Sequence, residues 1–216
     1  MTAADQLAAT DPATLFARLV ADMSERKARL LRVALARALW DEFKHPELRD
    51  AITVAERYAD GECGEEEYVE QVRRGYRLVS GPPEQRPAPF VHLQLAINSL
   101  SGTGLLLGRC GGKLPHEVGA PGGGNWQDAM GHAPAAAVAA IRDLFGGSSF
   151  DPRWRTETVT LLAEGIYRDR AFDRMPILAD ALEEAGCDRA EVLVHCREDG
   201  FHARGCWVVD GLLGKG

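Results

Sequence analysis

The sequence has no apolar run that approaches the roughly 18 to 20 residues needed to span a bilayer. Its first sixteen residues, MTAADQLAATDPATLF, lack the basic segment and apolar core of a secretory signal. Its five cysteines are odd in number and scattered, which argues against a secreted disulfide framework. These absences predict a cytoplasmic protein without a membrane partner, whose cysteines are free thiols, metal ligands or both.

An excess of positive charge is also missing. Lys and Arg number 25 against 32 acidic residues, a formal net charge of −7, so no general field draws the chain to nucleic acid or to an anionic membrane. The most basic run, SERKARLLRVALAR at residues 24–37, spaces its charges as one solvated helix face does. We therefore expect no nucleic-acid partner.

Complete catalytic motifs are absent as well. The glycine cluster 102–112 has Leu107 where a phosphate loop needs its first glycine and Leu114 where it needs Ser or Thr. Leu107 also replaces the third glycine of a dinucleotide fingerprint. The pair at 116–117 lacks the second histidine of a zinc protease, because Ala120 occupies that position. The sequence leaves open whether the protein is an enzyme.

What the sequence does contain is helical periodicity. With 45% hydrophobic residues in 216, the chain can bury a core. The fold class predicted is all-α, an irregular multi-helix bundle of about eight to ten helices. Residues 90–100 could be a helix or a strand, and we favour a helix. The other helices are predicted at 12–23, 24–40, 47–58, 65–78, 133–145, 154–168, 175–185, 189–197 and 205–213.

The composition changes in the middle of the chain. Residues 80–89, SGPPEQRPAP, contain four prolines, and residues 101–131 are rich in glycine. The domains predicted are a helical portion at 1–80, a Pro/Gly-rich linker or loop region at 81–132 and a second helical portion at 133–216, which could pack with the first. A ligand-binding role for the backbone amides of loop 102–131 is a weaker hypothesis.

Cysteine and histidine gather near the end of the chain, in GCDRAEVLVHCREDGFHARGCWVVD at residues 186–210. Zinc favours four ligands of these types in a tetrahedron. The spacing C-x7-H-C-x5-H-x3-C matches no standard zinc finger, but folding back of the short helices would bring its members together. Zinc is therefore the candidate cofactor, and the candidate metal ligands are Cys187, His195, Cys196, His202 and Cys206.

Two other interpretations of this stretch stay open. The cysteines could be small buried hydrophobic residues, with the histidines capping helix ends or bonding to backbone carbonyls. Alternatively, Cys206 could be a nucleophile whose pKa is lowered by a helix N-terminus, with His202 as its base and Asp210 orienting the histidine.

Both ends of the chain resemble an uncharacterised family of planctomycete-type bacteria. The N-terminal signature is SERKARLLRVALARALW followed by AERYADG, and the C-terminal one is AFDRMPILADALEEAGC, then HCR, then HARGCWVVDGLLGK. The piece LADALEEAGCDRAE also looks like the helix pair of a short repeat-companion domain. The resemblance implies a helical fold and no established activity, cofactor or catalytic residue. Relatives often have a cysteine cluster where this chain has VALA at 33–36, and a long Ala-rich helix where it has 80–131.

The leading functional hypothesis is a non-catalytic helical module for protein interaction or regulation, with a protein partner. It depends on the missing catalytic motifs and on amphipathic helices with acidic faces. The alternative is a metalloprotein or small enzyme that uses the C-terminal Cys/His cluster. No sustained heptad indicates an oligomeric state.

Overall fold

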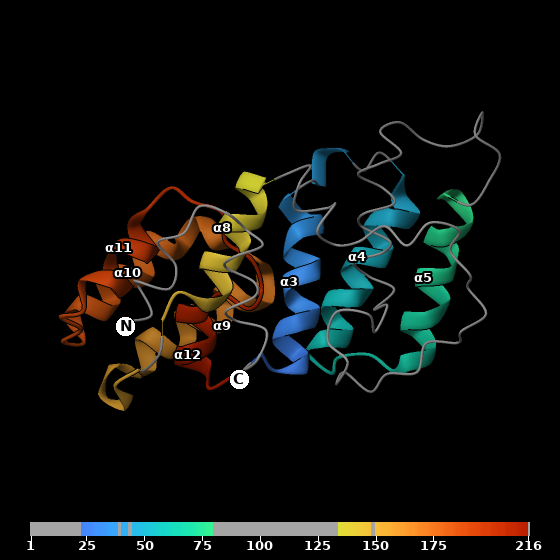
Figure 1. The fold of residues 1–216 in the computed structure, drawn as a ribbon. Coiled ribbons are helices and arrows are strands. Elements are labelled where there is room, and N and C mark those ends of the chain that lie inside the picture. The colour runs from blue at the N-terminus through green and yellow to red at the C-terminus, as the bar shows by residue number, and fades with distance from the viewer. Residues whose placement is uncertain (1–22, 39, 43–44, 80–133, 148–149, 216) are drawn as a thin grey trace. The chain divides into compact units, whose positions relative to one another are not determined.

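The computed structural model describes residues 23–38, 40–42, 45–79, 134–147 and 150–215. In this part of the chain there are eight α-helices, three short 3-10 helices and no strand, so the all-α prediction is confirmed (Figure 1). The helices are α3 (Glu25–Ala38), α4 (Pro46–Ala59), α5 (Glu65–Val79), α8 (Pro134–Phe145), α9 (Glu157–Asp169), α10 (Met175–Glu184), α11 (Ala190–Arg197) and α12 (Trp207–Leu213).

These elements belong to two compact units. Helices α3 to α5 form one, called here the N-terminal unit, and the residues from Val138 onwards belong to the other, the C-terminal unit. The predicted linker at 81–132 lies outside the described residues, as do the helix predicted at 90–100 and nearly all of the one at 12–23. None of the described helices has the length and apolarity that crossing a bilayer requires.

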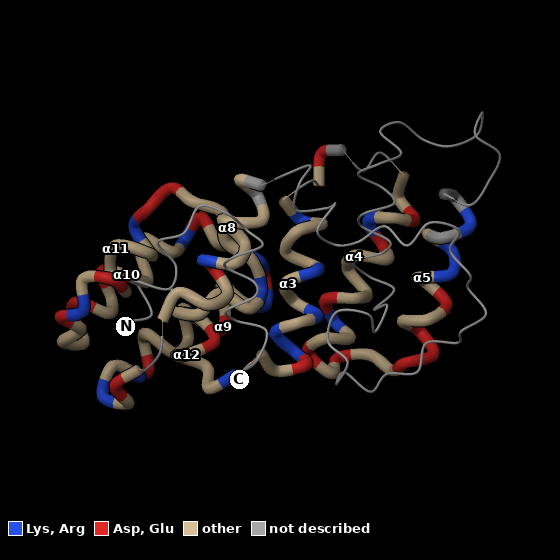
Figure 2. The backbone as a smooth tube through the Cα atoms, in the orientation of Figure 1, with Lys and Arg blue, Asp and Glu red and all other residues tan. Residues whose placement is uncertain are grey.

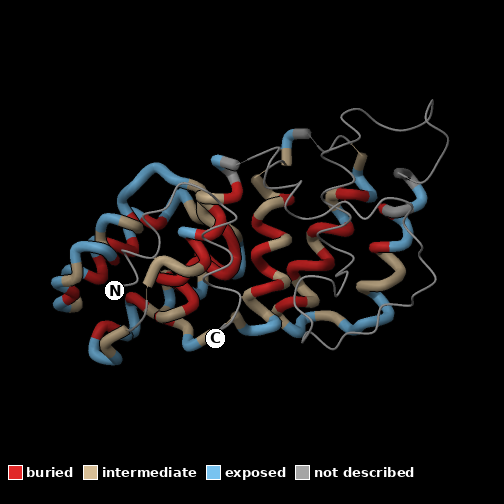
Figure 3. The backbone as a smooth tube through the Cα atoms, in the orientation of Figure 1, coloured by how far each residue is buried: buried red, intermediate tan, exposed pale blue. Residues whose placement is uncertain are grey.

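In the N-terminal unit, α3 packs on α4 and α4 on α5. Buried Leu, Ile, Val and Ala side chains recur along α3 and α4 and form the core between them (Figure 3). Tyr58 and Tyr68 stack with ring centroids 4.3 Å apart, which joins the end of α4 to the start of α5. Acidic residues open α5 and Arg77 lies in its last turn, an order that the helix dipole favours (Figure 2).

Two carboxylates of this unit are buried against arginines. Glu56 of α4 is 1% exposed and accepts a hydrogen bond of 3.0 Å from Arg37 of α3. The Asp60 carboxylate, at the end of α4, accepts one of 3.0 Å from Arg26. The Arg37–Glu56 pair therefore links α3 to α4, which are consecutive helices in the chain.

Helix α9 of the C-terminal unit begins at Glu157, three residues later than the sequence predicts. Trp154 lies in a 3-10 helix, Pro152–Trp154, and is buried in the core. The hydroxyl of Thr156, whose backbone is extended, accepts from Val159 N at 3.3 Å and caps α9. The predicted helix at 154–168 is therefore wrong at its start, because this cap fixes the first turn at Glu157.

Helices α9 to α12 surround one hydrophobic core. Gly186, with φ +86°, makes the turn from α10 to α11 in a conformation that other residues rarely adopt. The largest side chains of the core include Trp154, Ile166, Tyr167, Met175, Leu178, Leu182, Trp207 and Leu212, and three of the four described cysteines belong to it. The last turn of α8 and the loop from α11 to α12 carry the polar groups described next.

Candidate metal centre

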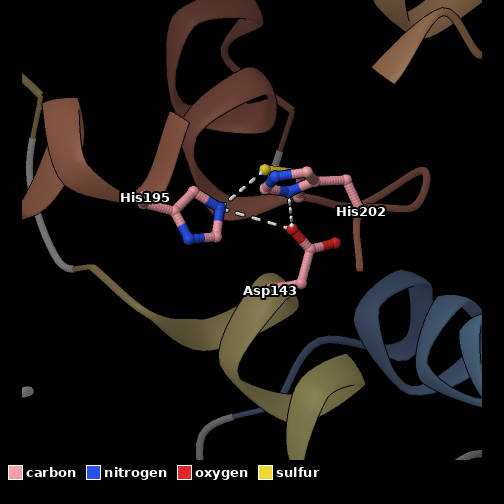
Figure 4. Close-up of side chains that lie close together, drawn as sticks. Asp143, His195 and His202 are labelled. Carbon is pink, nitrogen blue, oxygen red and sulfur yellow. Dashed lines mark hydrogen bonds and ion pairs between the residues drawn. The ribbon is translucent and has the colours of Figure 1, made fainter. Parts of the chain in front are cut away.

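Four side chains with metal-binding atoms meet inside the C-terminal unit: Asp143, His195, His202 and Cys206. One ligand atom from each lies within 4.8 Å of the others. The two imidazole rings, the sulfur and the carboxylate face one another (Figure 4). Asp143 comes from the last turn of α8, and His195 from the last turn of α11. The structure thus joins three of the five predicted ligands to a carboxylate that the sequence analysis missed.

The loop between α11 and α12 is shaped to bring its ligands together. Helix α11 ends at Arg197, and Cys206 is the N-cap of α12. Between them the Cys206 amide donates to the Ala203 carbonyl at 3.0 Å, and Gly205 has a φ of +96°. Since this left-handed conformation favours glycine, Gly205 permits the tight turn between His202 and Cys206.

The Asp143 carboxylate is the hub of the group and is 1% exposed. Its Oδ1 lies 2.8 Å from Nδ1 of His202 and 3.3 Å from Nε2 of His195, and its Oδ2 accepts from the Ala203 amide at 2.9 Å. Burial works to raise the pKa of Asp143, but the hydrogen bonds from the two histidines outweigh it and the pKa falls below its usual value. The carboxylate is therefore ionised near neutral pH.

His202 has one ring nitrogen satisfied and one not. An ionised carboxylate only accepts hydrogen bonds, so Nδ1 of His202 carries the proton that it shares with Asp143. A neutral ring then has its lone pair on Nε2, which is buried without a hydrogen-bond partner among the described residues. An ion bound by both Asp143 and His202 would take the place of the proton on Nδ1, because Nε2 points away from the carboxylate.

Cys206 is fully buried, with 0% exposure, and its Sγ lies 3.3 Å from Nε2 of His195. Burial first, and then the negative charge of Asp143, raise the pKa of this thiol well above its usual value. Hydrogen bonds from the Val208 and Val209 amides, at the start of α12, act in the opposite direction but are weaker. The helix start does act to lower the Cys206 pKa, but the prediction of a lowered pKa is wrong, because desolvation dominates.

The end of α8 packs directly on Trp207, the residue after Cys206. A Cβ on Gly146 would lie 2.4 Å from the indole nitrogen, and one on Gly147 2.0 Å from the six-membered ring. Only a residue without a side chain fits there. The Trp207 ring is also 5.3 Å from the His195 ring, centroid to centroid. This packing fixes the position of Asp143 relative to Cys206.

Arg204 anchors the same loop on its other side. It is 6% exposed, and its guanidinium donates to the carbonyls of Tyr167 at 3.2 Å and Arg168 at 3.4 Å. These carbonyls belong to the last turn of α9, where helix acceptors have no partner within the helix. Arg204 therefore ties the loop that carries His202 and Cys206 to the core of the unit.

The remaining predicted site residues lie elsewhere. Cys187 and Cys196, 3% and 0% exposed, belong to the hydrophobic core and are not in the group of four. Burial raises the pKa of Cys196 to about 12. The predicted orienting carboxylate, Asp210, is buried in α12, whereas the one that meets His202 is Asp143. The sequence signal for Asp143 is weak: it is the one acid in AAIRDLF, where Arg142 is the other charged residue.

The spacing of the group suits a tetrahedral ion. Zinc bonds of about 2.0 to 2.3 Å place neighbouring ligand atoms about 3.3 to 3.8 Å apart. Nε2 of His195 is 3.3 Å from both Cys206 Sγ and Asp143 Oδ1. The widest separation, 4.8 Å, needs a closure of about 1 Å. With four protein ligands and little exposure, such an ion would have no open position for a substrate.

No family model, curated protein or solved structure matches this chain. The resemblance of its two ends to an uncharacterised bacterial family stays a prediction.

Proposed function

We propose that the C-terminal unit is a non-catalytic helical module held together by one zinc ion, with Asp143, His195, His202 and Cys206 as ligands. The observation that carries the proposal is the convergence of these four side chains, two buried and two partly buried, within 4.8 Å.

The donor set favours zinc over other common ions. Magnesium and calcium take oxygen ligands, whereas two imidazoles, one thiolate and one carboxylate suit zinc. A divalent ion also balances the charges: with neutral imidazoles, the Asp143 carboxylate and the Cys206 thiolate supply two negative charges. A neutral buried site avoids much of the desolvation cost of isolated charges.

A cysteine enzyme is the second candidate, since Nε2 of His195 lies 3.3 Å from both Cys206 Sγ and Asp143 Oδ1. Its support is weaker. Reactive cysteines are partly exposed and have lowered pKa values. Cys206 has 0% exposure and a raised pKa. These properties favour a metal ligand, which releases its proton to solvent when the ion binds, over a nucleophile.

The proposed role of the module is to present a helical surface to a partner protein in the cytoplasm. Leu161, Ile177 and Val194, on α9, α10 and α11, are large apolar side chains that are 60%, 54% and 50% exposed. The described cysteines are all free thiols, which fits a reducing compartment. Metal would serve this role by holding the helices in place.

The test is metal analysis of the purified full chain and of two matched variants. About one zinc per chain is expected by elemental mass spectrometry, and thiol titration in denaturant should gain one thiol upon chelation. Cys206→Ala should lose the zinc, whereas Cys187→Ala, which removes a buried thiol outside the group, should retain it. A full chain that binds no zinc when zinc is supplied at neutral pH would refute the proposal.

A further inference from the structure

Building on the proposed zinc site, we infer that the ion acts as a clasp that holds the end of α8 against the α11–α12 segment. Three ligands, His195, His202 and Cys206, come from one short stretch of chain. The fourth, Asp143, lies 59 residues before His202. Binding of one ion to all four therefore joins two segments that the chain connects only through α9 and α10.

Without the ion, Asp143 still joins the two sides of this junction through hydrogen bonds. The Asp143 carboxylate accepts from His202 at 2.8 Å and from the Ala203 amide at 2.9 Å. Keeping an ionised carboxylate buried carries a desolvation cost that these hydrogen bonds must offset. The end of α8 also contacts this segment where Trp207 packs on Gly146 and Gly147.

The ion changes the charge balance at the junction. On binding, the Cys206 thiol releases its proton to solvent, and the ring nitrogens of His195 and His202 that bind the ion give up any proton they carry, so that sulfur and nitrogen each donate a lone pair. Two negative charges, on Asp143 and Cys206, then face a divalent cation. Pulling α8 away would expose a coordinated carboxylate and break a metal bond, which the metal-free junction does not require.

Helices α9 and α10 provide an internal comparison. They carry none of the four ligands, and their buried residues, among them Val159, Ile166, Leu178 and Leu182, pack in the hydrophobic core. Their attachment to the unit should depend little on the ion. The clasp thus predicts that metal removal loosens one helix end while neighbouring helices stay ordered.

Hydrogen–deuterium exchange of the full chain, with zinc and after chelation, tests this prediction. In zinc-free protein, exchange of amides 138–147 should accelerate at least about tenfold, while amides 157–184 change little. Asp143→Asn should give fast exchange at 138–147 whether or not zinc is present. The matched control, Cys187→Ala, should keep the zinc-dependent protection.

The outcomes separate the two proposals. If the chain binds one zinc but amides 138–147 exchange equally fast with and without it, the clasp is wrong and the zinc site stands. If all helices of the unit lose protection together on chelation, the ion supports the whole unit and the clasp is again wrong. If the chain binds no zinc, both proposals fail.

Discussion

The two units of this protein each bury a carboxylate to the same extent and use it differently. Glu56 in the N-terminal unit and Asp143 in the C-terminal unit are both 1% exposed. Glu56 meets the guanidinium of Arg37, which is permanently protonated and has no lone pair for a metal. Asp143 meets two imidazoles and lies beside a thiol, which all have a lone pair to give. The partners of a buried acid decide whether it forms an ion pair or a potential metal site.

Chelation should produce the largest difference in stability between the two units. Removing zinc should lower the free energy of unfolding of the C-terminal unit by about 4 kcal/mol if the free ion exceeds its dissociation constant a thousandfold. The N-terminal unit should be unaffected, because its buried acids are paired with arginines. Denaturant unfolding followed by hydrogen exchange measures each unit within the same chain. Equal destabilisation of both would contradict the comparison.

Breaking the Arg37–Glu56 ion pair should destabilise the N-terminal unit and leave the metal centre unaffected. Arg37→Met leaves the buried Glu56 without its Arg37 partner, and we expect the N-terminal unit to lose about 2 to 3 kcal/mol. The side chain of Arg37 is 17% exposed, which places the loss at the lower end for buried pairs. Zinc content, measured on the same sample, should stay at the level of the unsubstituted chain. A variant as stable as its parent would show that the pair contributes little.

A single methyl group should disturb the metal centre through packing alone. Gly147→Ala places a Cβ in the Trp207 ring, and relief of that overlap should cost about 1 to 3 kcal/mol and weaken zinc binding. Gly165→Ala is the matched control, because a Cβ there meets nothing within 4 Å inside α9. It should stabilise the helix by about 0.5 to 1 kcal/mol. Zinc titration and thermal unfolding of both variants measure the difference.

The smallest perturbation is a labelling experiment that leaves the fold intact. Cys63, in the N-terminal unit, is partly exposed, whereas Cys187, Cys196 and Cys206 are buried. Burial raises the pKa of Cys196 to about 12, so almost none of it is thiolate at pH 8. Mass spectrometry after brief alkylation should find Cys63 modified before the three buried thiols. Rapid labelling of Cys206 would revive the nucleophile hypothesis.

The helices were predictable because their signals are local. Apolar periodicity and acidic first turns identify α3 to α5, and prolines mark the starts of α4 and α10. The start of α9 was missed because the hydroxyl of Thr156 caps a helix that periodicity alone extends back to Trp154. Boundaries depend on such individual side chains more than the presence of a helix does.

The metal group was only partly predictable, for two physical reasons. Neighbouring residues on a helix point in different directions, so His195 of α11 faces the group while Cys196 enters the core. Density of cysteine and histidine in the sequence therefore overstates the number of ligands. Asp143 could not be assigned, because its role arises only when tertiary packing brings α8 to residues 59 positions away.

Trp207 gives the C-terminal unit a built-in optical probe. Its indole ring lies 5.3 Å from the ring of His195 and next to Cys206 in the chain. Indole emission is quenched by a paramagnetic ion at close range, so copper(II) or cobalt(II) in this group would quench the emission of Trp207. Metal binding at the centre could thus be followed in solution by the intrinsic fluorescence of Trp207.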